Sequence, residues 1–107
     1  MTMRFIMLMK ASALPDMEKY NEQLAKAGVL LDLSGLQPMS NGARVQFSEG
    51  KPRVIDDRFT DARESIAGYW LIQAKSKEEA IEWAKRVPFH DGEIEIRRLS
   101  EMSNDGF

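Results

Sequence analysis

The stretch from Ile66 to Pro88 constrains the fold most, because it joins a strand with two apolar faces to an amphipathic helix. Side chains alternate along a strand, so Trp70 and Ile72 project to one face while Tyr69 and Leu71 project to the other. A strand with one face in solvent alternates apolar and polar residues, and this one does not. We therefore expect both faces of this strand to be covered.

The helix after this strand is predicted from its ends and from its apolar stripe. Ser76 is a favourable N-cap, and Glu79 three residues later completes a capping box. The apolar stripe recurs at helical spacing and consists of Ala80, Ile81, Trp83, Ala84 and Val87. Pro88 ends the helix because its ring and its missing N–H are incompatible with a helix interior.

The remaining elements follow from apolar alternation and from turn residues. They are strands at residues 4–10, 29–33 and 93–99, a helix with Pro15 in its first turn and Gly28 just past its end, and a β-hairpin within residues 43–56. Glu49 and Gly50 form the expected hairpin turn, and Pro52 makes the return strand an edge strand. The hairpin is expected to be half-exposed and to lie beside the main sheet.

This order of elements predicts an α+β fold, a ferredoxin-like βαββαβ sandwich with an inserted β-hairpin. Two helices can cover only one face of its sheet, yet the strands at 4–10 and 29–33 are also apolar on both faces, apart from Asp32. A carboxylate in such a strand lies either at an edge of the sheet or in a pocket, and we expect the edge. A second copy is the expected cover for the other face, so the sequence predicts a homodimer through the sheet face with two-fold symmetry.

Length and composition bound the other possibilities. With 107 residues the chain is expected to form one domain over residues 1–100, followed by a polar tail over 101–107. The absence of cysteine excludes disulfides, a thiol nucleophile and cysteine zinc sites. A net charge of −2 with mixed signs argues against a nucleic-acid partner, and no apolar run approaches the ~18 residues of a membrane span. We expect a cytoplasmic protein.

Several segments together resemble one family. They are RFIMLMKA, KYNEQLAKAGVLLDLSGLQP, ARVQF, DDRF at residues 56–59 with TDARE after it, GYWLIQAKSKEEAIEWAKRVP and EIEIRRL. This set resembles the YCII-related superfamily, specifically its DGPF-domain branch, with Asp57 and Arg58 where the motif has Gly and Pro. The resemblance implies a ferredoxin-like fold that dimerises as a dimeric α/β barrel.

The resemblance also implies two kinds of function. The superfamily includes small-molecule lyases that use a His–Asp pair, and some members of the DGPF branch resemble accessory proteins associated with extracytoplasmic-function sigma factors. Asp32 resembles the aspartate of that pair in position. The histidine would lie near the first helix, where residues 11–20 contain none.

A cleft at the mouth of the barrel is the expected site. Its predicted ligand-binding residues are Lys10, Phe59, Tyr69 and Arg97, and its predicted catalytic residues are Asp32, Asp56 and Glu64. An aromatic wall with a few convergent charges suits a small-molecule ligand: a Lys or Arg holds a carboxylate-like group and a carboxylate moves a proton. The alternative is that Glu95 pairs with Arg97 across strands and that Tyr69 belongs to the dimer core.

The sequence therefore leaves more than one function open. The first is small-molecule binding or an acid–base, lyase-type enzyme that uses no cofactor and no metal. The alternative is a non-catalytic ligand-sensing or regulatory dimer that binds a protein partner, for example in sigma-factor-linked regulation. Heme or oxygen chemistry, as in other dimeric α/β barrels, is disfavoured because the only histidine, His90, falls in a predicted solvent-exposed turn.

Overall fold

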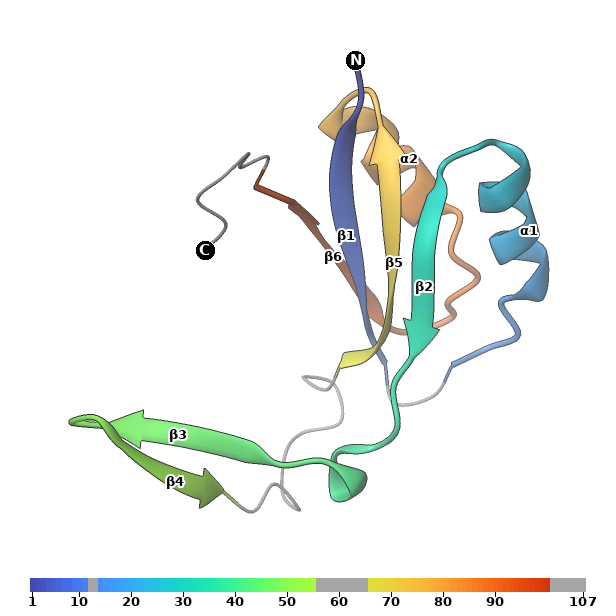
Figure 1. Ribbon diagram of the computed structural model, residues 1–107. Coiled ribbons are helices and arrows are strands. Elements are labelled where there is room, and N and C mark those ends of the chain that lie inside the picture. Colours follow the sequence, from blue (N-terminus) through green and yellow to red (C-terminus); the bar gives the residue numbers. More distant parts are fainter. Residues whose placement is uncertain (12–13, 56–65, 101–107) are drawn as a thin grey trace.

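The main body is a four-stranded antiparallel sheet in the order β2-β5-β1-β6, with both helices on one face (Figure 1). The computed structural model describes residues 1–11, 14–55 and 66–100. The sheet strands are β1 (Met3–Lys10), β2 (Leu30–Gly35), β5 (Ile66–Ala74) and β6 (Glu93–Arg98), and the helices are α1 (Glu18–Lys26) and α2 (Lys77–Lys85). The predicted α+β, ferredoxin-like fold is confirmed.

The core fills the space between the sheet and the helices, and Trp70 lies at its centre with no exposed surface. Its indole N–H donates to the Oδ1 of Asn21 at 2.8 Å, and its ring meets the edge of Tyr20 at a centroid distance of 5.1 Å. The Tyr20 hydroxyl in turn donates to the backbone carbonyl of Trp83 at 2.7 Å. Strand β5 is thereby tied to α1, and α1 to α2, by buried side chains whose polar atoms are satisfied.

Strand β2 is an edge strand that lies unusually close to β5. A Cβ atom added to Gly68 on β5 would lie 2.7 Å from the backbone oxygen of Ser34, so only glycine fits there. A β-bulge between Leu30 and Asp32 shifts the register of β2. The expectation that Asp32 lies at an edge of the sheet is confirmed.

The predicted N-terminal cap of α2 is confirmed, but α2 ends at Lys85, before the predicted stop at Pro88, and the predicted start of α1 is wrong. The Ser76 hydroxyl accepts from the Glu79 N–H at 3.1 Å, and the Glu79 carboxylate accepts from the N–H of Lys75, one residue before the cap. Helix α1 does not contain Pro15 in its first turn. The Asp16 carboxylate accepts from the Glu18 N–H at 3.0 Å, which closes a local turn, and the helix begins only at Glu18.

Strands β3 (Arg44–Ser48) and β4 (Lys51–Ile55) form a two-stranded sheet of their own, reached through a short 3₁₀ helix, η1 (Met39–Asn41). This hairpin projects away from the main body (Figure 1). Its turn is as predicted: Glu49 and Gly50 both have positive φ, 53° and 78°, as a type I′ turn requires. The expectation of half-exposure is wrong, because every residue of both strands except Ile55 is exposed.

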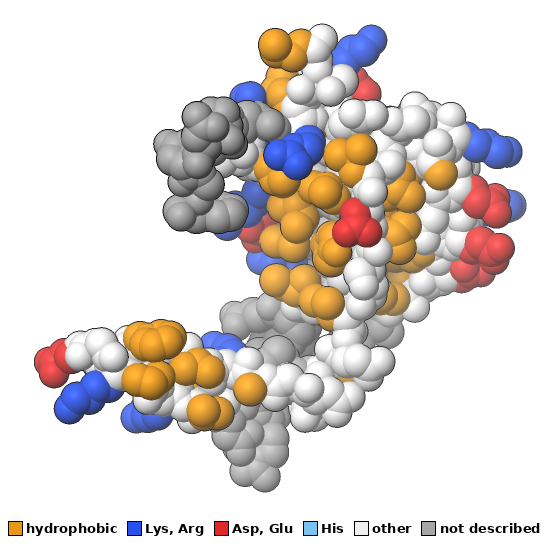
Figure 2. All heavy atoms as spheres, in the orientation of Figure 1, with side chains coloured by type: hydrophobic (Ala, Val, Ile, Leu, Met, Phe, Trp, Pro, Cys, Tyr) orange, Lys and Arg blue, Asp and Glu red, His pale blue; other side chains and the backbone are white. Residues whose placement is uncertain are grey.

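The sheet face opposite the helices is covered by none of the described helices and strands, and we call it the open face (Figure 1). Its centre consists of Ile6, Leu8, Tyr69 and Leu71, which the β1–β5 register places opposite one another in pairs. Figure 2 looks onto this face and shows apolar side chains gathered over β1, β5 and β2. The expectation of a sheet that is apolar on both faces is therefore met. Among the described residues, no helix is long and apolar enough to cross a membrane.

Replacing Trp70 by Ala should lower the free energy of unfolding by about 3–5 kcal/mol, because it leaves a cavity and removes the partner of Asn21. Trp83→Ala is the matched control, since Trp83 is only partly buried and packs at the rim of the core under Arg86. Trp83→Ala should lower the free energy of unfolding clearly less than Trp70→Ala does. Denaturant unfolding of both variants measures the difference, and equal losses would contradict the central position of Trp70.

Candidate functional site

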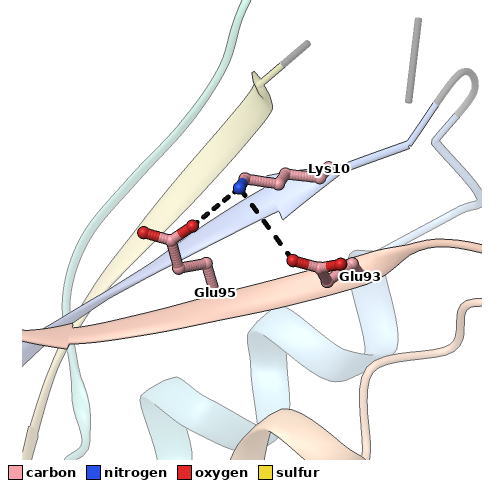
Figure 3. Close-up of polar contacts among 3 residues, drawn as sticks. All are labelled: Lys10, Glu93 and Glu95. Atoms are coloured by element: carbon pink, nitrogen blue, oxygen red, sulfur yellow. Dashed lines mark hydrogen bonds and ion pairs between the residues drawn. The ribbon is translucent and has the colours of Figure 1, made fainter. Parts of the chain in front are cut away.

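Lys10 ends β1 with its side chain on the open face, between two carboxylates of β6 (Figure 3). Its Nζ lies 2.6 Å from the Oε1 of Glu95 and 3.9 Å from the Oε2 of Glu93. The β1–β6 register brings these residues together because Glu93 pairs with Lys10 and Glu95 with Leu8. The hydrogen bond and the charge of Lys10 lower the pKa of Glu95, and the charge of Arg97 adds to this effect. Glu95 is therefore ionised at neutral pH.

Asp32 and Tyr69 form a second polar pair, on the β2 side of the open face. The Tyr69 hydroxyl donates to the Oδ2 of Asp32 at 3.0 Å, while the Oδ1 of Asp32 accepts from the backbone N–H of Leu33 at 2.8 Å. The hydrogen bond to Asp32 and its negative charge raise the pKa of Tyr69. At neutral pH the pair is thus a phenol donating to a carboxylate.

The two pairs flank the apolar centre of the open face. Strands β2 and β6 are the outer strands, so their backbones are three strand spacings, about 14 Å, apart. Leu8 lies between them, because it is paired with Tyr69 on one side and with Glu95 on the other. An apolar floor with a phenol, a cation and carboxylates at its borders has the composition of a surface that holds a small polar molecule.

The structure places four of the predicted site residues on one face but does not join them in one cluster. Lys10, Asp32, Tyr69 and Arg97 all lie on the open face, in two pairs and one outer position opposite Ile6. Asp56, Phe59 and Glu64 lie outside the described residues. The alternative, in which Glu95 pairs with Arg97, is wrong. Glu95 instead accepts a short hydrogen bond from Lys10, whose side chain lies on the same face of the sheet.

Sequence reasoning missed Glu95 and Glu93 as members of the site. Alternation along residues 93–98 places both, with Arg97, on the face opposite Ile94 and Ile96, so their side of the sheet was readable. The sequence did not predict that Lys10 is the partner of these two glutamates, because Lys10 is 85 residues away from Glu95 and the contact depends on strand register. His90 is 99% exposed and 3.7 Å from Asp91, so it lies in the solvent-exposed turn that was predicted.

With this geometry established, comparison with known proteins identifies the family. The model of the YCII-related domain matches residues 6–103. The chain belongs to the YCII-related family. It is also similar to the uncharacterized protein R00369 of Rhizobium meliloti (strain 1021), with 27% identity over 88 residues, which are 79% of this chain and 71% of that protein. The resemblance inferred from sequence segments is confirmed at the level of the family.

Within the YCII-related fold, the position of Asp32 has a phenol beside it. The side-chain hydrogen-bond donor to its carboxylate is the hydroxyl of Tyr69. A tyrosine with a raised pKa donates hydrogen bonds well but does not act as a base near neutral pH. In the described ranges, no three His, Cys, Asp or Glu side chains come together as metal ligands.

Asp32→Asn should lower the pKa of Tyr69 toward that of a free phenol, because the carboxylate that stabilises the protonated form is gone. The chain has two tyrosines, and burial raises the pKa of Tyr20 as well. Absorbance titration should therefore show one of two tyrosinate steps moving to lower pH. The step that moves should be the one that Tyr69→Phe removes.

The same hydrogen bond makes the stability of the fold depend on pH. Since the folded-state pKa of Tyr69 is raised, the contribution of this hydrogen bond to the free energy of unfolding is present below about pH 10 and is lost above it. An unchanged titration would contradict the Asp32–Tyr69 hydrogen bond.

Proposed function

We propose that the protein is a homodimer that binds a small molecule at the open face and acts on it by acid–base, lyase-type chemistry. One observation carries the proposal. Two polar pairs, Lys10–Glu95 and Asp32–Tyr69, border a single apolar surface that none of the described elements covers. Surfaces of this kind are where proteins hold small ligands, provided that something closes them from water.

The proposed dimer would close the site from water. Ile6, Leu8 and Leu71 lie on the open face, and a contiguous apolar patch of this kind marks an interaction surface. A second copy stacked on this face by a two-fold axis would bury both patches at once and form a dimeric α/β barrel. Assignment to the DGPF-domain branch and a cytoplasmic location belong to the same proposal.

Each of the candidate site residues that the structure describes then has a role in ligand binding or proton transfer. Arg97 would attract a carboxylate-like group of the ligand, Lys10 would bind this group by exchanging its ion pair with Glu95, and Tyr69 would donate a hydrogen bond to a ligand oxygen. The Asp32 carboxylate would take a proton from a carbon of the substrate, whose leaving group would depart with its bonding electron pair as a double bond forms. Asp56 and Glu64 as catalytic residues and Phe59 as a wall complete the proposed site.

A ligand-sensing or regulatory dimer is the second candidate, and one observation favours it. Lys10 is already neutralised by Glu95, and Tyr69 is held in its protonated form by Asp32. Both pairs are thus suited to exchanging partners when a ligand arrives, without any chemical step. Such a dimer would pass the change to a protein partner, as in sigma-factor-linked regulation.

A thermal-shift screen of small carboxylic acids tests the proposed site. At least one compound should raise the midpoint of wild-type unfolding by several degrees at saturation, as mass action requires. Lys10→Met and Asp32→Asn should reduce or abolish that shift. Lys85→Met is the matched control, because Lys85 pairs with Glu82 on the exposed side of α2 and should leave the shift intact.

The same compounds separate the two candidates. If wild-type protein converts the bound compound and Asp32→Asn binds it without conversion, Asp32 is the base. Binding without conversion by either protein would favour the sensor. A stabilising compound whose effect is equal in all four proteins would contradict the open-face site.

A further inference from the structure

We propose that the β3–β4 hairpin is an arm that packs its apolar face against a second copy of this chain. The proposal rests on the homodimer proposed above and adds a second contact surface to it. It concerns residues 44–55, which neither the acid–base site nor the core uses.

The hairpin lacks support from the rest of the chain that the structure describes. Its two strands pair only with each other, and all of their residues except Ile55 are exposed. A two-stranded hairpin by itself is marginally stable at best in water, and it needs a further strand or a packing surface. The radius of gyration, 15.9 Å, exceeds the about 13 Å of a compact chain of this size, in agreement with a projecting segment.

One face of the hairpin is apolar throughout. The register pairs Val45 with Val54 and Phe47 with Pro52, and alternation along each strand puts all four side chains on the same face. Phe47 is 71% exposed and Val54 is 72% exposed. Large apolar side chains that gather on one exposed face mark a surface that binds a partner.

The apolar face of the hairpin looks in the same direction as the open face of the main sheet. Figure 2 shows both orange clusters turned toward the viewer, one over β1, β5 and β2 and the other on the hairpin. A partner seated on the open face therefore lies on the side to which the hairpin presents its apolar residues. Since the proposed partner is a second copy, the two-fold axis makes the contact reciprocal, and each copy both extends an arm and receives one.

The area of the proposed contact matches what a stable dimer needs. Four strands of six to nine residues present a sheet face of about 460 Å² in plan, which is less than the about 800 Å² that each partner of a standard interface buries. A five-residue hairpin presents about 160 Å² per face. Each copy buries this area on its own arm and an equal area on the surface that receives the other arm, outside the sheet face already counted, which brings the total to about 780 Å².

Sedimentation velocity of Phe47→Ser tests the arm. The dimer dissociation constant should rise at least about tenfold, because a two-fold dimer loses the buried phenylalanine twice. Gln46→Ser is the matched control on the polar face of the same strand, and it should change the constant less than about twofold.

Photo-crosslinking identifies what the arm touches. A photoreactive phenylalanine analogue at position 47, in a mixture of isotopically light and heavy protein, should give crosslinked peptides that join a light chain to a heavy chain. If the dimer persists while Phe47→Ser behaves like Gln46→Ser and crosslinks stay within one chain, the arm is overturned and the sheet-face dimer stands. Crosslinks in cell extract to a different protein, with none between copies, also overturn the arm. A wild-type protein that is monomeric at every concentration overturns the arm and the dimer together.

Discussion

The structure depends on a mismatch between a sheet with two apolar faces and the two α-helices of the described residues, which cover one face alone. On the helix side, Trp70 and its neighbours bury their apolar surface within a single copy of the chain. On the open side, Ile6, Leu8 and Leu71 remain without a cover from the described elements. Because burying apolar area is the main favourable term in folding and association, the same physics that folds the monomer also favours its assembly.

The polar residues of the candidate site follow from the same constraint. The centre of the open face has to be apolar if it is to be buried, so charged groups are tolerated only at its periphery, on the outer strands and at the strand ends. Asp32 lies on β2 and Glu95 on β6, and each finds its partner on an inner strand. The candidate site therefore lies at the border of the proposed interface, where a pocket can be dry on one side and reachable from solvent on the other.

Local signals in the sequence predicted the features that local forces determine. Alternation in β5, the Ser76 cap and the Glu49–Gly50 turn all depend on near neighbours, and all are confirmed. The start of α1 was missed because the Asp16 carboxylate competes for a backbone N–H. The partner of Lys10, and the fact that β3 and β4 form a sheet separate from the described main sheet, were not predictable, since both depend on how segments far apart in the chain are placed.

The molar mass in solution tests the central claim most directly. Light scattering on the wild-type protein at micromolar concentration should give twice the chain mass of 12.2 kDa. A mass of one chain at all accessible concentrations would contradict the account, because the apolar open face would then be stable in water without a partner.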